Sequence, residues 1–131
     1  MSKILIVEDS PDNMKLFTTI LGLKGHEVTG LPGGEGLLET VQRTGPDLVL
    51  MDIQLPGKDG FALLQEIRQS PSPRLRVIAL TAHAMTGDRE MCLNAGMDGY
   101  VAKPVKKDAL FAEITRVQAS LLEGENHGTA L

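Results

Sequence analysis

Short runs of apolar residues alternate along the chain with longer amphipathic stretches. This order is typical of an α/β domain in which helices alternate with the strands of a parallel sheet. Three runs, residues 4–7, 47–51 and 77–80, are apolar almost throughout, which predicts central strands covered on both faces. Residues 26–31 and 99–103 are mixed with polar side chains or shorter, and we expect them at the edges of the sheet.

The amphipathic stretches between these runs predict five helices. Ser10 and Pro11 provide a cap and a first-turn proline for a helix that Gly25 can end. The next helices are expected over residues 36–44, from the cap Asp59 to the proline-rich segment 70–73, and over residues 87–95, and a last one has an apolar stripe that reaches Leu121. We expect one domain over residues 1–122 and a flexible tail over residues 123–131.

The order of the strands follows from the short connections between them. Crossovers between parallel strands are right-handed, which leaves few topologies. If the first and third strands are central neighbours, the chain reverses its winding between them and the strand order is 2-1-3-4-5. The sequence therefore predicts a doubly wound, five-stranded parallel sheet of the flavodoxin-like (βα)5 class. In such a sheet a ligand binds in the crevice at the carboxyl ends of the strands.

The composition narrows the classes of function. A chain of 131 residues, 42% of them hydrophobic, can form one globular domain with a single core. A net charge of -4 and an aromatic content of 3% disfavour binding to nucleic acid or to an anionic membrane. Cys92 is the single cysteine, so the chain can form no internal disulfide, and we expect a cytoplasmic location. No apolar run approaches the roughly 18 residues that span a bilayer.

Polar side chains follow or end the apolar runs at the carboxyl ends of the predicted strands. The residues concerned are Glu8, Asp9, Asp52, Thr81 and Lys103. Gathered carboxylates repel one another unless a cation joins them, and a small all-oxygen site is suited to Mg²⁺. The lysine and the hydroxyl complete what phosphoryl transfer requires, namely a carboxylate nucleophile, cations that neutralise the phosphoryl oxygens and a hydrogen-bond donor.

Four motifs, in this order along the chain, resemble the receiver domain of two-component response regulators (CheY-like). They are Val7-Glu8-Asp9, Met51-Asp52-Ile53-Gln54-Leu55-Pro56-Gly57 with Asp59-Gly60, Ala79-Leu80-Thr81-Ala82, and Lys103-Pro104. The resemblance extends from about residue 3 to residue 121. It implies a signalling switch that accepts a phosphoryl group and is not an enzyme beyond slow self-dephosphorylation.

The resemblance implies a role for each matching acidic position. Asp52 is expected to accept a phosphoryl group from the phosphohistidine of a histidine kinase or a phosphotransfer protein. The implied ligands of Mg²⁺ are Asp9, Asp52 and the backbone carbonyl of Gln54, with Glu8 acting through water.

Further positions are implied to complete the switch. Lys103 is expected to pair with a phosphoryl oxygen, and the peptide bond between Lys103 and Pro104 is a candidate for the cis isomer. Thr81 is expected to move its hydroxyl towards the phosphorylated aspartate and Tyr100 to follow it, which alters the face of the fourth helix, fifth strand and fifth helix. A downstream protein is expected to bind this face. His83, like Gln54, is a candidate for tuning the hydrolysis of the acyl phosphate.

Finer similarity points to single-domain receivers of the DivK type and to the receivers of hybrid histidine kinases. It rests on residues 13–17, 51–56, 81–85 and 95–98. With no output domain in the chain, we expect a stand-alone receiver, a monomer or a phosphorylation-dependent dimer, that acts through protein contacts. A receiver excised from a hybrid kinase is the alternative.

Two other functions are compatible with the same pattern. A small Mg²⁺-dependent phosphatase also forms an aspartyl phosphate, but Gln54 stands where a second acid/base aspartate would be needed. A flavodoxin-like cofactor binder would share the strand order, but the carboxylates would repel its phosphate unless a metal were present. The receiver is therefore the leading hypothesis.

Overall fold

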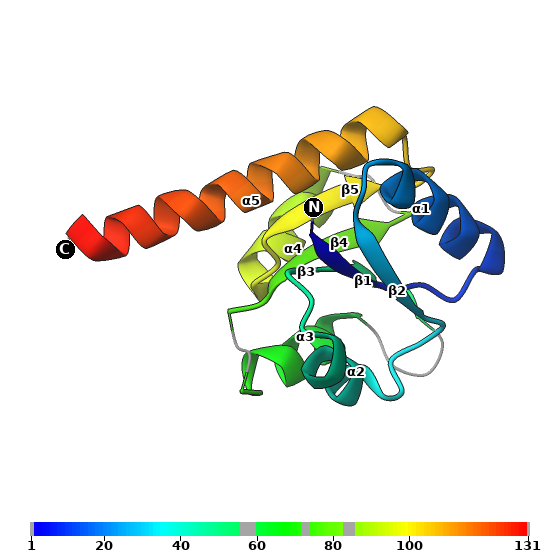
Figure 1. The fold of residues 1–131 in the computed structure, drawn as a ribbon, viewed down its shortest axis with the longest axis horizontal. Coiled ribbons are helices and arrows are strands. Elements are labelled where there is room, and N and C mark those ends of the chain that lie inside the picture. The colour runs from blue at the N-terminus through cyan, green and yellow to red at the C-terminus, as the bar shows by residue number, and fades with distance from the viewer. Residues whose placement is uncertain (1, 56–59, 72–73, 83–85, 131) are drawn as a thin grey trace.

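Strands and helices alternate strictly along the chain (Figure 1). A computed structural model describes residues 2–55, 60–71, 74–82 and 86–130, with the side chains of residues 86–88 and 120–130 outside this description. The elements are β1 (Lys3–Val7), α1 (Pro11–Leu23), β2 (Glu27–Leu31), α2 (Leu37–Thr44), β3 (Leu48–Asp52), α3 (Gly60–Arg68), β4 (Arg76–Thr81), α4 (Thr86–Ala95), β5 (Gly99–Ala102) and α5 (Lys107–Ala130). The predicted α/β class is confirmed.

The five strands form one parallel sheet in the order β2-β1-β3-β4-β5, as predicted. The chain reverses its winding between β1 and β3, which are hydrogen-bonded neighbours. The register pairs Val7 with Met51 and Thr81 with Ala102, so the carboxyl ends of the strands lie at one edge of the sheet. The residues that follow β1 and β5 therefore come close to Asp52, the last residue of β3.

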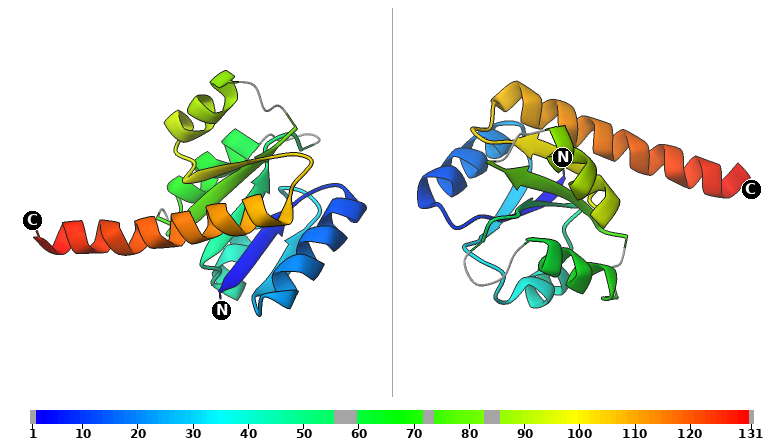
Figure 2. Two further views of the ribbon diagram at one scale, coloured as in Figure 1. Left: turned by 90° about the horizontal axis from the view of Figure 1, so that it is seen from above. Right: turned by 180° about the vertical axis from the view of Figure 1, so that it is seen from behind.

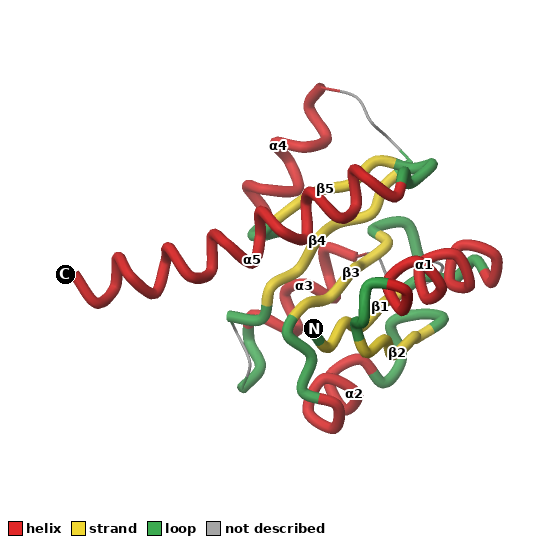
Figure 3. Tube along the Cα trace, turned by 45° about the horizontal axis from the view of Figure 1, so that its top comes forward, coloured by secondary structure: helices red, strands yellow, loops and turns green. Residues whose placement is uncertain are grey.

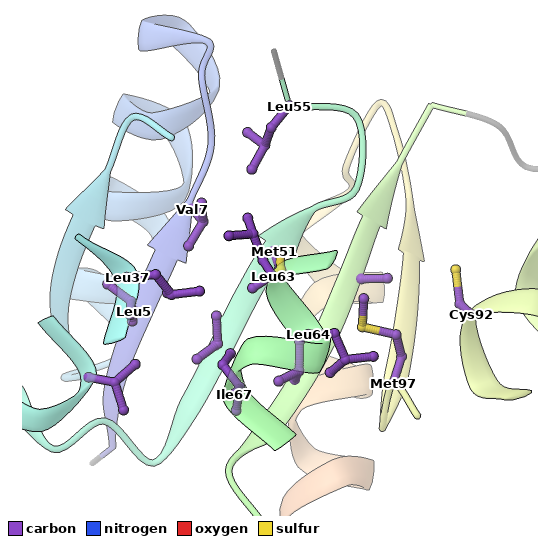
Figure 4. Close-up of a cluster of buried hydrophobic side chains, with 14 residues drawn as sticks. Leu5, Val7, Leu37, Met51, Leu55, Leu63, Leu64, Ile67, Cys92 and Met97 are labelled. Atoms are coloured by element: carbon purple, nitrogen blue, oxygen red, sulfur yellow. The ribbon is translucent and has the colours of Figure 1, made fainter. Parts of the chain in front are cut away.

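Helices cover both faces of the sheet. Figure 2 shows α1 and α5 on one side and α2 and α3 on the other, and Figure 3 gives the same arrangement with the strands in yellow between them. The buried cluster in Figure 4 packs α2, α3 and α4 against the sheet, with Leu37, Leu64 and Cys92 as examples from the three helices. A second cluster packs Phe17 of α1 and Ile114 of α5 against the opposite face.

The alternation of side chains along β1 shows why the central strands are continuously apolar. Leu5 and Val7 belong to the cluster beneath α2, α3 and α4, whereas Ile4 and Ile6 belong to the cluster beneath α1 and α5. Successive side chains of a strand point to opposite faces, so a strand covered on both sides needs apolar residues at every position. This is the pattern from which the sequence predicts the central strands.

Helix α1 begins as the sequence predicts. Ser10 is its N-cap and its side chain accepts a hydrogen bond from the backbone N–H of Asn13 at 3.3 Å. Pro11 occupies the first helical position, where a missing N–H costs nothing. The helix ends at Leu23, shortly before Gly25, whose φ of 85° lies in the left-handed region that favours glycine. The cap places Asn13 in the first turn, next to the carboxyl end of β1.

Some element boundaries differ slightly from the predicted ones. β3 begins at Leu48 rather than at Asp47, whose side chain accepts a hydrogen bond from the backbone N–H of Lys3 at 2.9 Å. β2 begins at Glu27 rather than at His26, whose Nδ1 atom accepts a hydrogen bond from Ser2 N at 3.1 Å. Helix α5 continues to Ala130, so the backbone of the predicted tail is helical up to that residue. The flexibility of this segment and the boundary at residue 122 stay predictions.

The amino end of β4 is held by Asp98, which lies between α4 and β5. Its carboxylate accepts hydrogen bonds from the Arg68 guanidinium at 3.0 Å, the Arg76 guanidinium at 3.1 Å and the backbone N–H of Val77 at 2.8 Å. The Asp98 carbonyl accepts a further hydrogen bond from Arg116 of α5 at 2.9 Å. These contacts join α3, β4 and α5 at the edge opposite the acidic residues. Nowhere in the described part of the chain is there a helix of the length and hydropathy needed to cross a membrane.

A Gly60→Ala substitution is expected to destabilise the protein by about 1–3 kcal/mol. Gly60 is buried at the start of α3, and an added Cβ would lie 2.6 Å from the Cα of Ile53 and 3.0 Å from the carbonyl oxygen of Asp52. These are backbone atoms, so the loop after β3 must shift. Chemical denaturation measures the loss.

Gly22→Ala is the matched control for this substitution. Gly22 lies in α1 and has no atom within 4 Å of an added Cβ. Alanine is expected to stabilise the helix there by about 0.5–1 kcal/mol. Equal effects of the two substitutions would show that the close approach at Gly60 is not a constraint.

Candidate functional site

Three carboxylates meet at the carboxyl edge of the sheet. Glu8 and Asp9 directly follow β1, and Asp52 ends the neighbouring strand β3. Each of the three offers a carboxylate oxygen, and these oxygens all lie within 4.8 Å of one another. Glu8 and Asp52 are buried, whereas Asp9 is exposed. The structure therefore brings the predicted acidic residues into one group that is open on the Asp9 side.

Lys103 joins the two buried carboxylates. Its Nζ atom donates hydrogen bonds to Glu8 Oε1 at 2.7 Å and to Asp52 Oδ2 at 2.9 Å. Lys103 follows β5, and its backbone N–H donates to the carbonyl of Thr81 at 2.6 Å. The peptide bond between Lys103 and Pro104 is cis. The side chain of Lys103 is 17% exposed, so its ammonium group neutralises the buried carboxylates in a partly desolvated setting.

The two buried carboxylates differ in their affinity for protons. Burial, together with the hydrogen bond and the charge of Asp52, raises the pKa of Glu8 to about 7, although Lys103 opposes this rise. Burial also acts to raise the pKa of Asp52, but hydrogen bonds from Glu8, from the backbone N–H of Gln54 and from Lys103 outweigh it and lower the pKa. Of the two buried carboxylates, Glu8 therefore binds a proton more readily than Asp52.

The donor set fits a hard divalent cation. Carboxylate oxygens are the ligands that Mg²⁺ prefers, and Mg²⁺ usually retains several waters, which an open site permits. A carboxylate oxygen of the exposed Asp9 lies within 4.8 Å of one of the buried Asp52, a separation that a single cation can bridge. These residues can therefore hold Mg²⁺, with the remaining positions left for water or a phosphoryl oxygen.

The other predicted site residues occupy different positions around the cluster. The backbone N–H of Gln54 donates to Asp52 Oδ1 at 2.9 Å, and the Gln54 side chain is exposed. Thr81 is buried at the end of β4, and its carbonyl is the acceptor for Lys103. Tyr100 of β5 is half-buried and packs against the cluster beneath α2, α3 and α4. His83, like the predicted cap Asp59, lies outside the described residues.

Asn13 is a contact of the cluster to which the sequence reasoning gives no role. Its Nδ2 atom donates a hydrogen bond to Glu8 Oε1 at 3.0 Å. A signal for it exists in the sequence, because a helix capped at Ser10 places Asn13 in its first turn, beside the residues that follow β1. Only the three-dimensional structure shows that the side chain turns towards Glu8.

Glu8 is expected to make the metal-free protein less stable as the pH rises. Its pKa is higher in the folded state than its ordinary value of 4.5, so the folded state binds more protons. This contribution to stability is complete below about pH 4.5 and is lost as the pH rises through about 7. The free energy of unfolding in EDTA should therefore fall by up to about 3 kcal/mol between about pH 5 and about pH 8. Chemical denaturation at several pH values measures this slope.

Glu8→Gln is the control for this pH dependence. The substitution removes the titrating group and should flatten the profile. His26 acts in the opposite direction, because burial and the charge of the N-terminus lower its pKa and its contribution grows as the pH rises. His26 is present in both proteins, so the difference between their profiles isolates Glu8. Parallel profiles would contradict the assignment.

Sequence comparison identifies the class of protein. Residues 4–115 match the model of the family described as "Response regulator receiver domain". The match covers most of the chain and all of the cluster from Glu8 to Lys103. The chain therefore belongs to the response regulator receiver domain family, and the predicted resemblance is confirmed.

Similar proteins include a sensor protein and a histidine-protein kinase. The chain is 40% identical over 112 residues to the sensor protein GacS of Pseudomonas syringae pv. syringae. The aligned region covers 82% of this chain and 12% of that protein. It is 39% identical over 108 residues to the signal transduction histidine-protein kinase BarA of Escherichia coli K12, with the same two coverages of 82% and 12%. The chain thus spans about an eighth of the length of these relatives.

Solved structures share the fold. The receiver domain of the sensor histidine kinase PA1611 from Pseudomonas aeruginosa PAO1 has a TM-score of 0.76 and 41% identity, covering 85% of this chain and 92% of that one. That structure has a magnesium ion coordinated in its active-site cleft. A response regulator structure from Chloroflexus aurantiacus has a TM-score of 0.83 and 29% identity, covering 90% of this chain and 98% of that one.

Proposed function

We propose that Asp52 is the phosphoacceptor of this receiver and that Mg²⁺ binds beside it. The observation that carries this proposal is the arrangement around Asp52, whose Oδ2 lies 2.9 Å from the ammonium group of Lys103 and whose carboxylate shares one group with Glu8 and Asp9. A nucleophilic carboxylate must be ionised, and Asp52 is the member of the buried pair whose pKa is lowered.

The proposed reaction moves one phosphoryl group from a phosphohistidine. A carboxylate oxygen of Asp52 forms a bond to phosphorus while the phosphorus–nitrogen bond breaks, and the bonding pair leaves with the imidazole nitrogen. Lys103 lies within reach of Asp52 and can pair with a phosphoryl oxygen, as an ammonium group in a desolvated site does. Bound Mg²⁺ supplies charge neutralisation at the phosphoryl oxygens. Asp9, Asp52 and the Gln54 carbonyl would hold it, with Glu8 acting through water.

The proposed switch passes from Asp52 to β5 through Thr81 and Lys103. The Thr81 carbonyl and the Lys103 N–H are hydrogen-bonded at 2.6 Å, so the ends of β4 and β5 are linked beside Asp52. To change the receiver from mostly inactive to mostly active, phosphorylation must favour the active conformation by about 5 kcal/mol. This exceeds the ~1 kcal/mol of a single neutral hydrogen bond. We therefore propose that Lys103, the metal and the Thr81 hydroxyl all bind the phosphoryl group in the active conformation. Tyr100 is proposed to move after Thr81.

The proposed output surface is formed by α4, β5 and α5. The backbone N–H of Tyr100 donates to the Glu113 carboxylate of α5 at 2.7 Å, so a change in β5 reaches that helix directly. A cavity of about 420 Å³ lies on this face, and its lining includes Tyr100, Pro104 and Ala112. A downstream protein would bind there, with phosphorylation controlling its affinity.

The phosphoryl donor is proposed to be a histidine kinase or a phosphotransfer protein in the cytoplasm. Receiver domains interact with such donors, and the named relatives are themselves sensor kinases. That the receiver stands alone stays a prediction, with a receiver excised from a hybrid kinase as the alternative. That it is a monomer or a phosphorylation-dependent dimer also stays a prediction.

Incubation with Mg²⁺ and acetyl phosphate tests the proposed function. Mass spectrometry of the intact protein should show the addition of one phosphoryl group, and EDTA should prevent it. The label should decay slowly, because the proposed role is that of a phosphoacceptor and not of a phosphatase. Absence of labelling would contradict the phosphoacceptor role, and multiple turnover on metabolite phosphates would favour the phosphatase alternative.

A further inference from the structure

Asn13 reaches the acidic cluster from a helix to which the proposed function assigns no part. Its Nδ2 atom lies 3.0 Å from Glu8 Oε1, and the side chain is half-buried. Glu8 is the carboxylate that the proposed function links to Mg²⁺ through water. The contact therefore joins the first turn of α1 to the proposed metal site.

The local sequence makes this contact unusual for a helix start. With Ser10 as N-cap, Asn13 is the third helical residue, the position from which a Glu or Gln side chain often returns to the N–H of the cap. Ser10 accepts the hydrogen bond from the backbone N–H of Asn13, which is half of such a reciprocal arrangement. The Asn13 side chain instead donates to Glu8. Its amide therefore serves the cluster rather than the cap.

The Glu8 carboxylate is held through both of its oxygens. Oε1 accepts from Asn13 Nδ2 at 3.0 Å and from Lys103 Nζ at 2.7 Å, and Oε2 accepts from the backbone N–H of Asp9 at 3.1 Å. The Glu8 side chain has no exposed area. Hydrogen-bond donors in the protein, and not bulk solvent, therefore set the orientation of this carboxylate.

The two side-chain donors on Oε1 differ in charge. Lys103 is a cation, and in the proposed function it pairs with a phosphoryl oxygen once Asp52 is phosphorylated. Asn13 is neutral and gains no comparable attraction to the phosphoryl group. Its position is also fixed because α1 packs against the sheet through the buried Phe17 and Leu21. Asn13 can therefore keep Glu8 in place while Lys103 changes partner.

We propose that Asn13 is a positioning residue of the metal site, which holds Glu8 Oε1 so that Glu8 can orient a metal-bound water. The proposal rests on the proposed function, because it requires Mg²⁺ to bind at the cluster. Groups that hydrogen-bond a metal ligand typically contribute about tenfold or more to metal affinity. Glu8 is such a group for the metal-bound water, and Asn13 supports Glu8, so about tenfold is the upper end of the effect expected from Asn13. Replacing Asn13 should thus weaken Mg²⁺ binding even though Asn13 does not contact the ion.

Isothermal titration with MgCl2 tests the proposal on the full chain. Asn13→Ala removes the amide, and Asn13→Leu removes it while keeping a side chain of similar shape. Both variants are expected to bind Mg²⁺ more weakly than the wild type, by up to about tenfold. Ser10→Ala is the matched control, because it weakens the same helical turn but leaves the amide in place. It should lower the melting temperature and leave the Mg²⁺ affinity unchanged.

A double-mutant cycle separates positioning from a general loss of structure. If Asn13 acts through Glu8, Asn13→Leu should cause no further loss of Mg²⁺ affinity in the Glu8→Gln background. Independent, additive losses would overturn the proposal, as would unchanged affinity in both Asn13 variants. A wild-type protein that binds no Mg²⁺ would instead overturn the proposed metal site itself, so the two failures are distinguishable.

Discussion

Asp52→Asn is expected to abolish phosphoryl labelling by acetyl phosphate. The amide has nearly the shape of the carboxylate, and its oxygen can still accept the hydrogen bond that the Gln54 N–H donates at 2.9 Å. It lacks the anionic oxygen that attacks phosphorus, so the phosphorus–oxygen bond cannot form. Intact mass spectrometry should therefore show no added phosphoryl group under conditions that label the wild type.

Asp47→Asn supplies the matched control for this experiment. Asp47 precedes β3 and Asp52 ends it, so the same chemical change is made at opposite ends of one strand. The Asp47 carboxylate accepts a hydrogen bond from the backbone of Lys3 and is remote from the acidic cluster in the register of the sheet. This variant should be labelled like the wild type. Full labelling of Asp52→Asn would refute the assignment of the phosphoacceptor.

Lys103→Met is expected to slow labelling by at least about tenfold and to destabilise the metal-free protein. The substitution removes the cation that lies 2.7 Å from Glu8 and 2.9 Å from Asp52. Removing one partner of a buried ion pair typically costs about 3–5 kcal/mol, because the remaining charge is left without compensation. Glu8 can limit this cost by keeping a proton, since Lys103 is the group that acts to lower its pKa.

The loss of stability in Lys103→Met should therefore increase with pH. At low pH Glu8 is protonated, and Asp52 is the only buried anion of the pair. At about pH 8 Glu8 loses its proton when the chain unfolds. In the folded variant it must either repel Asp52 as a second anion without Lys103 or stay protonated, and both lower the free energy of unfolding. Chemical denaturation in EDTA at about pH 5.5 and about pH 8 measures the difference. Lys106→Met, at an exposed position shortly after Lys103, is the control and should change neither stability nor labelling markedly. A pH-independent loss in Lys103→Met would contradict the coupling to Glu8.

The fold was predictable because its signals are local and repeated. Leu5 and Ile6 are successive apolar residues that enter different cores, and this pattern predicts a strand covered on both faces without knowledge of its neighbours. Ser10 and Pro11 likewise mark a helix start from adjacent residues alone. The sequence did not show that the Asp47 side chain, next to the start of β3, accepts a hydrogen bond from the distant Lys3.

The candidate site was predictable only as a set of residues at one edge. Parallel strands bring their carboxyl ends together, so Glu8, Asp52 and Lys103 could be placed in one region from their positions after apolar runs. Which atoms bond could not be predicted, because Glu8 and Lys103 are 95 residues apart and their contact depends on side-chain orientation across several strands. The contact between Asn13 and Glu8 joins residues close in the sequence, but the direction in which the Asn13 side chain turns could not be predicted.

The sequence by itself determines the elements, their order in the sheet and the family of this protein. Apolar periodicity and short-range caps depend on neighbouring residues, and the motifs are read directly from the chain. Only the tertiary structure decides how the charges are shared. It raises the pKa of Glu8, lowers that of Asp52 and joins both carboxylates to Lys103. The physical reason is that burial and through-space hydrogen bonds, which set these properties, exist only once the strands have assembled.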